Sequence, residues 1–392
     1  MHKTIMIIAG EASGDLHGGA LASSLKEMEP HLRLIGLGGE RMMRAQVESY
    51  RNIEDLSVVG LGEILSNLKK FKAVFRLLVE RLDSEKPDCV VLIDYPEFNL
   101  RFAQEVKKRG IPLVYYISPQ VWAWRKGRIK IIKKTVDKMI VIFKFEEQMY
   151  KKEGIHAEFV GHPLLDVVKP QFSKDEFIRR GGLDGNKKII ALLPGSREIE
   201  VIRNLPTMID AASLIKEKTE EDIQFVIAKV PTIKDEIYEK NVKRHGFESK
   251  IIEGYPYDCI NVSDLVLVAS GTATLETAIL EKPMLIIYKV SLLTWFVGKM
   301  LVKIPNIGLV NIVAGERIIP EFIQFNATPQ KIATEAISLL FSQQKLNETK
   351  IKLKTVKEKL GETQASKRAA QIILETLESN TTRQVNVWGG RP

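Results

Sequence analysis

Residues 192–197 read LLPGSR, and residues 269–276 read ASGTATLE. Each stretch begins in a predicted buried strand and should open a helix. Backbone N–H groups at a helix start have no partner within the helix, the helix dipole adds partial positive charge there, and glycine lets an anion approach the backbone. The two turns together predict a phosphate site. For either turn alone, an ordinary strand-to-helix connection remains the alternative.

Side chains in the two turns narrow the prediction to a nucleotide diphosphate. Arg197 can neutralise a diphosphate, and Glu276 can accept hydrogen bonds from ribose hydroxyls. The remaining contacts would come from backbone and hydroxyl groups. The predicted site comprises Gly195, Ser196, Arg197, Ser270, Gly271, Thr272 and Glu276.

Short apolar runs alternate with amphipathic segments in both halves of the chain. The strand candidates are 4–9, 32–36, 89–94, 113–117, 139–143, 157–160, 188–193, 224–228, 250–253, 265–269 and 284–288. This alternation predicts parallel, doubly wound α/β sheets, whose ligands bind at the carboxyl ends of the strands. At 392 residues the chain should form two domains, 1–166 and 167–360, facing each other across a substrate cleft. A helix at 361–378 and a disordered tail at 379–392 should follow.

The composition favours anionic partners and gives no sign of a metal centre. Lys and Arg number 58 and Asp and Glu 49, for a formal net charge of +9, which suits nucleotides, phospholipid surfaces or nucleic acid alike. Cys89 and Cys259 lie in apolar runs and are typical of reduced, buried thiols in a cytosolic protein. There is no CxxC or HExxH, no signal peptide, and no apolar run near the ~18 residues of a membrane span.

An acidic turn, GEASGD at 10–15, follows the first strand. Its spacing is not GxGxxG, and the carboxylates of Glu11 and Asp15 would repel a pyrophosphate. The turn therefore suits sugar hydroxyls or a proton-accepting role. The alternative is a tight turn in which Ser13 or Asp15 caps the next helix.

A second carboxylate, Asp94, ends a buried strand in the sequence DYPEFN at 94–99. Pro96 forces a turn immediately after it. A carboxylate at this edge can act as a general base, and partial burial would raise its pKa from the reference value of about 3.9. Helix capping by Asp94 is the alternative, although Glu97 and Asn99 are better candidates for that task.

Tryptophans and cations follow in SPQVWAWR at 118–125 and in the basic run to 138. A solvated helix face is the default interpretation of the basic run. Trp122, Trp124 and Arg125 add an aromatic, cationic rim suited to an amphiphilic anion. Base stacking is a competing interpretation, but no nucleic-acid module accompanies it, and we expect no nucleic-acid partner.

An apolar stripe recurs at helical spacing between residues 60 and 76. It comprises Leu61, Ile64, Leu65, Leu68, Phe71 and Phe75, with Lys69, Lys70, Lys72 and Arg76 on the other face. The pattern fits a core-facing helix, or an interfacial or acyl-chain-binding segment. A second apolar and basic segment, 292–303, is too short to span a bilayer. Both segments predict a peripheral membrane protein.

In combination, these motifs resemble the lipid-A-disaccharide synthase family from Thr4 to Ala370. The resemblance rests on 9–15, on 93–99, on 118–125, on Gly161-His162, on 192–197, on 269–276 and on NIVAG at 311–315. The family is similar to GT-B glycosyltransferases, which have two Rossmann-like domains and a last helix that returns to the N-terminal domain. Glu97 is a departure, because an Asp-x-Pro-Asp form also occurs in the family.

The resemblance implies an inverting transfer without metal or cofactor. The donor would be UDP-2,3-diacylglucosamine, the acceptor 2,3-diacylglucosamine 1-phosphate, and the place of action the cytoplasmic face of the inner membrane. Asp94 would be the base, with Glu11 as a second candidate, and Arg197 would neutralise the departing UDP. Ser13 and Asn311 would contact the donor. A homodimer is compatible with this reading.

Two other functions fit part of the pattern. A UDP-N-acetylglucosamine 2-epimerase on the same fold would need no acyl site, so the apolar stripe argues mildly against it. A non-catalytic nucleotide-binding membrane adaptor would use the phosphate turns without Asp94.

Overall fold

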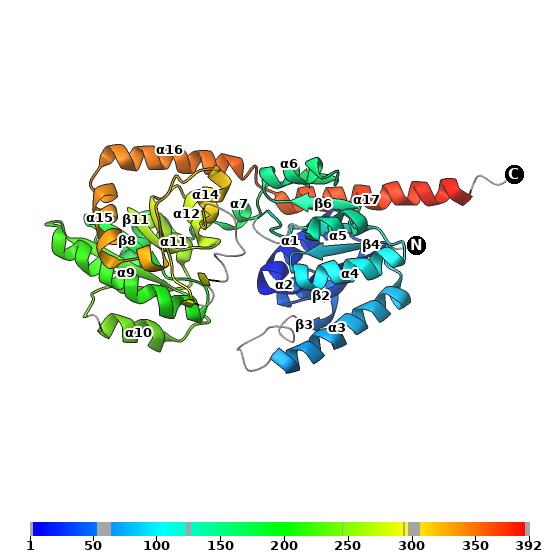
Figure 1. Cartoon of the computed structure of the whole chain (residues 1–392), viewed down its shortest axis with the longest axis horizontal. Coiled ribbons are helices and arrows are strands. Elements are labelled where there is room, and N and C mark those ends of the chain that lie inside the picture. The colour runs from blue at the N-terminus through cyan, green and yellow to red at the C-terminus, as the bar shows by residue number, and fades with distance from the viewer. Residues whose placement is uncertain are drawn as a thin grey trace. The chain divides into compact units, whose positions relative to one another are not determined.

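The computed structural model describes residues 3–52, 64–122, 127–244, 246–292, 295–296 and 306–388. The chain forms two compact units, and each is described by itself. Unit 1 contains the chain up to Pro163 and again from Gly361 onward, and unit 2 is Leu164–Leu360. The first crossing from unit 1 to unit 2 lies between Pro163 and Leu164. Figure 1 draws unit 1 from blue through cyan to green at α6, with its last helix in red, and unit 2 from green to orange.

In the described residues, unit 1 is built on a parallel sheet of seven strands in the order β3-β2-β1-β4-β5-β6-β7. The strand order reverses between β1 and β4, and ligands of such sheets bind beside this switch point. The strands are β1 (Thr4–Ala9), β2 (Arg33–Gly38), β3 (Val47–Asn52), β4 (Cys89–Ile93), β5 (Leu113–Tyr116), β6 (Lys138–Val141) and β7 (Ala157–Phe159).

Helices cover this sheet, and their apolar faces complete its core. They are α1 (Ala12–Met28), α2 (Glu40–Arg44), α3 (Ile64–Glu85), α4 (Pro96–Lys108), α5 (Arg128–Thr135), α6 (Lys144–Lys152) and α17 (Ala365–Trp388). The last helix packs along α1. Its Arg368 guanidinium donates to the carbonyl of Val160 at 2.6 and 2.8 Å. The helix continues to Trp388, beyond Glu378, so residues 379–388 are helical and not the disordered tail that the sequence predicts.

Unit 2 repeats the design with a parallel sheet that has, in the described residues, six strands in the order β10-β9-β8-β11-β12-β13. They are β8 (Lys188–Leu193), β9 (Ile223–Lys229), β10 (Lys250–Glu253), β11 (Leu265–Ala269), β12 (Met284–Tyr288) and β13 (Glu321–Ile323). The switch point lies between β8 and β11. The helices are α7 (Leu164–Val167), α8 (Lys174–Arg180), α9 (Glu198–Lys218), α10 (Asp235–Arg244), α11 (Pro256–Val262), α12 (Ala273–Ile279), α14 (Leu309–Ala314), α15 (Pro329–Leu340) and α16 (Gln343–Lys359).

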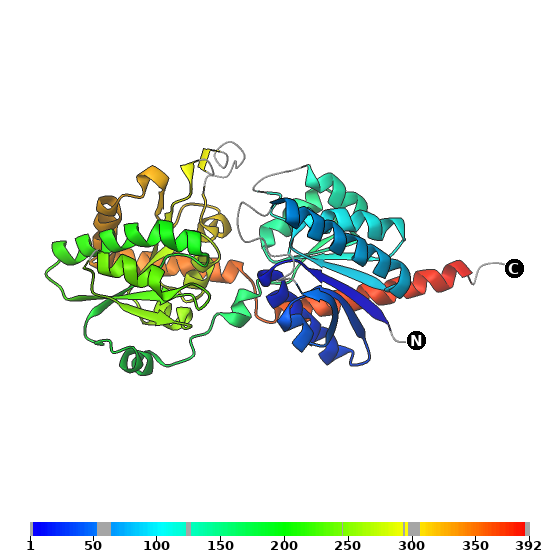
Figure 2. The same cartoon turned by 90° about the horizontal axis from the view of Figure 1, so that it is seen from below.

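The strand register brings the predicted motifs together in pairs within each unit. Ala9 at the end of β1 pairs with Ile93 at the end of β4, so the turns that carry Glu11 and Asp94 leave the sheet side by side. In unit 2, Leu193 pairs with Val268, which sets the turns after β8 and β11 next to each other. Each pair of turns flanks a switch point. Figure 2 shows the same two sheets from below.

Candidate functional site

The turn after β4 holds Asp94 in an unusual backbone conformation. Asp94 and Tyr95 both have positive φ angles, 45° and 43°. Residues with side chains rarely adopt this left-handed region, and such strain concentrates at functional sites. Burial, followed by the nearby negative charge of Glu11, raises the pKa of Asp94 to about 6. The structure therefore makes Asp94 a stronger base than an ordinary aspartate.

The neighbouring turn after β1 presents Glu11 and Ser13 to solvent. Glu11 stands at the N-cap position of α1, but its side chain makes no capping hydrogen bond. Asp15 is different, because its buried carboxylate accepts backbone N–H groups at the start of α2. The donors are Gly39 at 2.7 Å and Arg41 and Met42 at 3.1 Å. Asp15 therefore lies within α1 and caps α2, not the next helix that the capping alternative named.

Trp122 of the predicted rim is anchored to a buried acid. Its indole N–H donates to Oε1 of Glu146 at 3.1 Å, and its ring lies edge-on to Phe145. Glu146 is 1% exposed, and burial raises its pKa to about 8, so this carboxyl is protonated at neutral pH. Trp124 and Arg125 lie outside the described residues.

The apolar stripe is only partly described, and at Phe71 it faces the core. The ring of Phe71 lies 5.0 Å from that of Phe98 on α4 in an edge-to-face contact. Leu61 lies outside the described residues, as do the side chains of Ile64, Leu65 and Leu68. We therefore revise the assignment of Phe71 from membrane or acceptor contact to core. Among the described helices, none combines the length and apolar character needed to cross a membrane.

The turn after β8 is already occupied by an acidic side chain of its own helix. Backbone N–H groups of Ser196 and Arg197 donate to Oε2 of Glu200, at 2.9 and 3.3 Å. Gly195 has a φ of 138°, and a Cβ there would lie 2.4 Å from that of Glu200. The sequence predicts unpaired N–H groups at this turn, and at these two residues the prediction is wrong. The side chain of Arg197 is 77% exposed.

Asn204, which the sequence analysis missed, braces this turn from inside α9. It is 1% exposed. Its amide donates to the carbonyl of Pro194 at 3.1 Å and accepts from the backbone N–H of Lys289 at 3.0 Å. Asn204 therefore ties the Gly195 turn to the end of β12. A polar residue on the buried face of an amphipathic helix was the signal available.

The turn after β11 leaves room around its glycine. Gly271 has a φ of 149°, and no atom of the described residues lies within 4 Å of a Cβ built there. The hydroxyl of Ser270 donates to the carbonyl of Ile307 at 3.2 Å, while Thr272 is exposed at the N-cap of α12. Burial raises the pKa of Glu276, one turn further on, to about 7. This turn keeps the open, glycine-lined form that the sequence predicts.

Asn311 has a structural position that corrects its predicted role. It is fully buried, and its amide donates to the carbonyl of Ile319 and to Glu321, each at 2.8 Å. Its oxygen accepts N–H groups of Ile318 and Ile319 at 3.0 and 2.9 Å. These four bonds use the whole capacity of an amide. Asn311 therefore holds the loop before β13 and has no bond left for a sugar donor.

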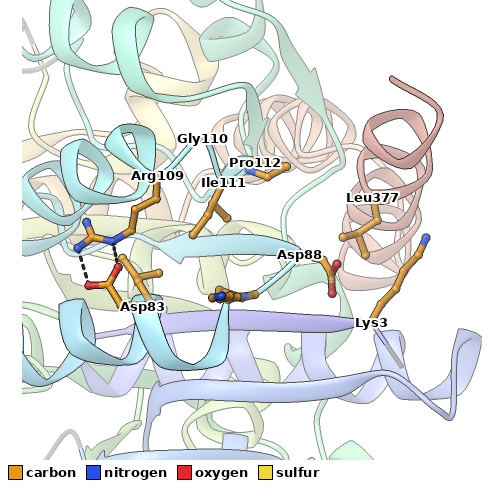
Figure 3. Close-up of a pocket in the computed structure, with 11 residues that line it drawn as sticks. Lys3, Asp83, Asp88, Arg109, Gly110, Ile111, Pro112 and Leu377 are labelled. Atoms are coloured by element: carbon orange, nitrogen blue, oxygen red, sulfur yellow. Dashed lines mark hydrogen bonds and ion pairs between the residues drawn. The ribbon is translucent and has the colours of Figure 1, made fainter. Parts of the chain in front are cut away.

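A pocket of about 440 Å³ lies at the end of the unit 1 sheet that is opposite to the Asp94 turn (Figure 3). Lys3 and Asp88 precede β1 and β4, and Leu377 of α17 closes one side. Arg109 and Asp83 on its wall pair with each other through two hydrogen bonds of 2.7 and 2.9 Å. The strands begin at this end of the sheet, whereas Asp94 lies at the end where they stop. The described residues contain no group of three or more His, Cys, Asp or Glu side chains placed to hold a metal.

The two Rossmann-like units, with their polar turns at both switch points, define a GT-B-type fold, the architecture of many nucleotide-sugar enzymes. Comparison with known proteins agrees. A family model described as lipid-A-disaccharide synthetase matches residues 5–375, and the chain belongs to this family. It is therefore an enzyme, a glycosyltransferase. The lipid-A-disaccharide synthase of Syntrophus aciditrophicus is 46% identical over 86% of this chain and 88% of its own length. That of Geobacter sulfurreducens is 41% identical over 95% and 97%.

Solved structures with low sequence identity share the fold. A glycosyltransferase from Rickettsia africae superposes with a TM-score of 0.58 at 13% identity, covering 97% of this chain and 99% of its own. The UDP-GlcNAc 2-epimerase from Neisseria meningitidis, bound to UDP-GlcNAc, gives 0.56 at 15% identity, covering 97% and 100%. At such identities the likeness concerns the fold alone, so the epimerase does not define the activity of this chain.

Proposed function

We propose that this glycosyltransferase divides its chemistry between its units, with the base in unit 1 and the hold on the departing nucleotide in unit 2. The donor is UDP-2,3-diacylglucosamine and the acceptor 2,3-diacylglucosamine 1-phosphate. The products are the β-1,6-linked disaccharide 1-phosphate of lipid A and UDP. Family membership supports the substrates. The observation that carries the mechanism is the partly buried carboxylate of Asp94, with its raised pKa, at the switch point of unit 1.

Asp94 accepts the proton of the acceptor's 6-hydroxyl in this scheme. The oxygen attacks C1 of the donor sugar from the face opposite UDP, the bond from C1 to the UDP oxygen breaks, and the configuration inverts from α to β. A pKa of about 6 suits this task, because the carboxylate is ionised at neutral pH and still has an appreciable proton affinity. Glu11 assists by raising that affinity through its charge.

Unit 2 stabilises the negative charge that develops on UDP. Arg197 pairs with the diphosphate, and the turn after β11 offers the backbone N–H groups of Gly271 and Thr272, because that of Ser270 already donates to the carbonyl of Ile287. Glu276 accepts from the ribose hydroxyls. Groups that are fixed before the reaction can stabilise a leaving anion without a metal. The open surroundings of Gly271 and the exposed guanidinium of Arg197 support this assignment.

Association with the cytoplasmic face of the inner membrane completes the proposal, since both substrates carry acyl chains. The exposed side chains of Lys69, Lys70 and Lys72 on α3 support it, because cations beside an apolar surface favour anionic lipid. Co-sedimentation with vesicles containing an anionic phospholipid tests this part. Binding that is equal for neutral vesicles would contradict the electrostatic contribution.

The central test is release of UDP from UDP-2,3-diacylglucosamine with and without the lipid acceptor. We expect release that depends on the acceptor, and a loss of at least about 100-fold in kcat for Asp94→Asn. Asp83→Asn is the matched control, because this exposed carboxylate pairs with Arg109 at the opposite sheet edge. A rate in Asp94→Asn equal to that of the control would remove Asp94 from the mechanism. Turnover of the nucleotide sugar without acceptor would favour an epimerase.

A further inference from the structure

We propose that Asn99 and Tyr115 are positioning residues that hold the Asp94 carboxylate in its reactive orientation. The inference rests on the proposed role of Asp94 as the base. It concerns two side chains that do not meet substrate and act through the backbone of the Asp94 turn.

Both side chains donate to the same carbonyl group. The Asn99 amide donates to the Asp94 carbonyl at 2.8 Å, and the Tyr115 hydroxyl donates to it at 2.6 Å. The Asn99 amide also donates to the carbonyl of Ile93 at 3.1 Å. The peptide between Asp94 and Tyr95 therefore cannot rotate without breaking both bonds to its oxygen.

The restraint matters because the turn would otherwise relax. Two successive residues with side chains at positive φ are strained, and such conformations persist only where surrounding contacts over-determine them. The direction of the Asp94 side chain follows from its own φ. A change to a negative φ would turn the carboxylate away from its present, partly buried place beside Glu11.

The two donors are rigid because each side chain is buried and belongs to a helix or a strand. Asn99 lies in the first turns of α4 and Tyr115 in β5, where it pairs in register with Leu92 of β4. Both side chains are fully buried. Water does not readily reach this interior. If either donor is removed, the carbonyl of Asp94 therefore loses a hydrogen bond that nothing replaces.

Charged groups face this turn from several elements. Glu11 approaches Asp94 from the turn after β1 and raises its pKa. Arg128 of α5 acts on Tyr115, opposing the rise that burial and Asp94 cause in the pKa of the phenol. Arg128 itself pairs with Glu97 at the start of α4. A carboxylate released from this surrounding loses both the burial and the repulsion that hold its pKa near 6.

The experiment compares Tyr115→Phe and Asn99→Ala with the wild-type enzyme. Tyr115→Phe keeps the ring and removes one hydroxyl, so it answers the question if Asn99→Ala fails to fold. The matched control is Tyr238→Phe, which removes a buried hydroxyl from unit 2 that accepts a bond from the Val230 N–H. For each, kcat, the KM for UDP-2,3-diacylglucosamine and the pH profile of kcat/KM are measured by UDP release.

We expect kcat to fall about 10- to 100-fold in Tyr115→Phe, with the donor KM nearly unchanged, because a misplaced base costs rate and leaves nucleotide binding intact. The acidic limb of the pH profile of kcat/KM should move from near pH 6 toward about 4, the ordinary pKa of an aspartate. Tyr238→Phe should leave the limb in place. A Tyr115→Phe enzyme that retains the wild-type kcat and limb overturns the inference. Should Asp94→Asn also stay active, the fault lies with the proposed base instead.

Discussion

Tyr95 lies directly over Gly10, so close that a Cβ on Gly10 would stand 2.1 Å from Cδ1 of the ring. This contact joins the turn after β1 to the turn after β4. It explains why glycine occupies the first position of the acidic turn, since any side chain would push the ring away and disturb its strained neighbour Asp94.

Gly10→Ala should therefore displace the Tyr95 ring. Over-packing of this kind typically costs about 1–3 kcal/mol, so we expect a lower melting temperature and a loss of turnover. Thermal denaturation and UDP release measure the two effects. Gly127→Ala is the control, because no atom of the described residues lies within 4 Å of its Cβ position and its φ of −58° suits any residue. Equal stability in the two variants would contradict the contact.

Asp94 should oppose stability at neutral pH. Its pKa is raised on folding, so the folded state binds the proton more tightly, and the resulting stabilisation is present at low pH and lost as pH rises through about 6. Asp94→Asn should therefore raise the melting temperature at pH 7.5, by about 2–4 °C for each kcal/mol relieved, while turnover is lost. The gain should vanish near pH 4. A variant less stable than wild type at pH 7.5 would contradict the raised pKa.

Arg197→Ala should lose turnover by about two to three orders of magnitude, as for other groups that stabilise charge in a transition state. Its exposed side chain contributes little to folding, so the melting temperature should stay the same. Arg180→Ala, which removes an exposed arginine of α8 paired with Glu176, serves as the control. Near-normal rates in Arg197→Ala would refute its role.

Glu200→Gln should bind UDP more tightly than the wild-type enzyme. The amide oxygen can still accept the N–H groups of Ser196 and Arg197, but the negative charge beside the proposed diphosphate site is gone. We expect a few-fold lower Kd, with the difference shrinking at high salt. Calorimetric titration with UDP measures it. A Kd that rises would show that Glu200 supports nucleotide binding.

Phe71→Ser should destabilise unit 1, because its ring packs against Phe98. A half-buried aromatic ring contributes less than the 3–5 kcal/mol of a fully buried one, and we expect a loss of about 1–3 kcal/mol. Serines at Leu61, Ile64, Leu65 and Leu68 should instead weaken vesicle binding and leave the melting temperature unchanged. Phe325→Ser, at a ring that is 70% exposed, is the stability control. An unchanged melting temperature in Phe71→Ser would restore this residue to the membrane surface.

Periodicity predicted most of the architecture and the pairing of motifs at the switch points. The continuous apolar runs of buried parallel strands give β1, β8, β11 and β12 their observed bounds. The strand Val47–Asn52 escaped because its sequence, VESYRN, is polar and lies at the sheet edge. The three-residue β13 is too short to show any period.

Sequence patterns could not predict the side-chain hydrogen bonds that join distant segments. The motif around Asn311 resembles a ligand-binding loop, yet its amide is consumed by Ile318, Ile319 and Glu321. The role of Glu200 had a local signal, an acid at the third helical position, but the N-cap Arg197 is not the serine or threonine of a capping box. The position of Asp94 at the end of a strand could be predicted, because the apolar run of β4 stops there in the sequence.

The helix α17 packs against α1, although the whole of unit 2 separates the two helices in the sequence. The strands of unit 1 are translated before unit 2, but α17, which covers α1, is translated after it. Unit 1 therefore cannot complete its fold, and α1 stays without its covering helix, until unit 2 has been translated. A premature stop after Leu360 would leave unit 2 complete but would remove α17 from unit 1 and so destabilise unit 1.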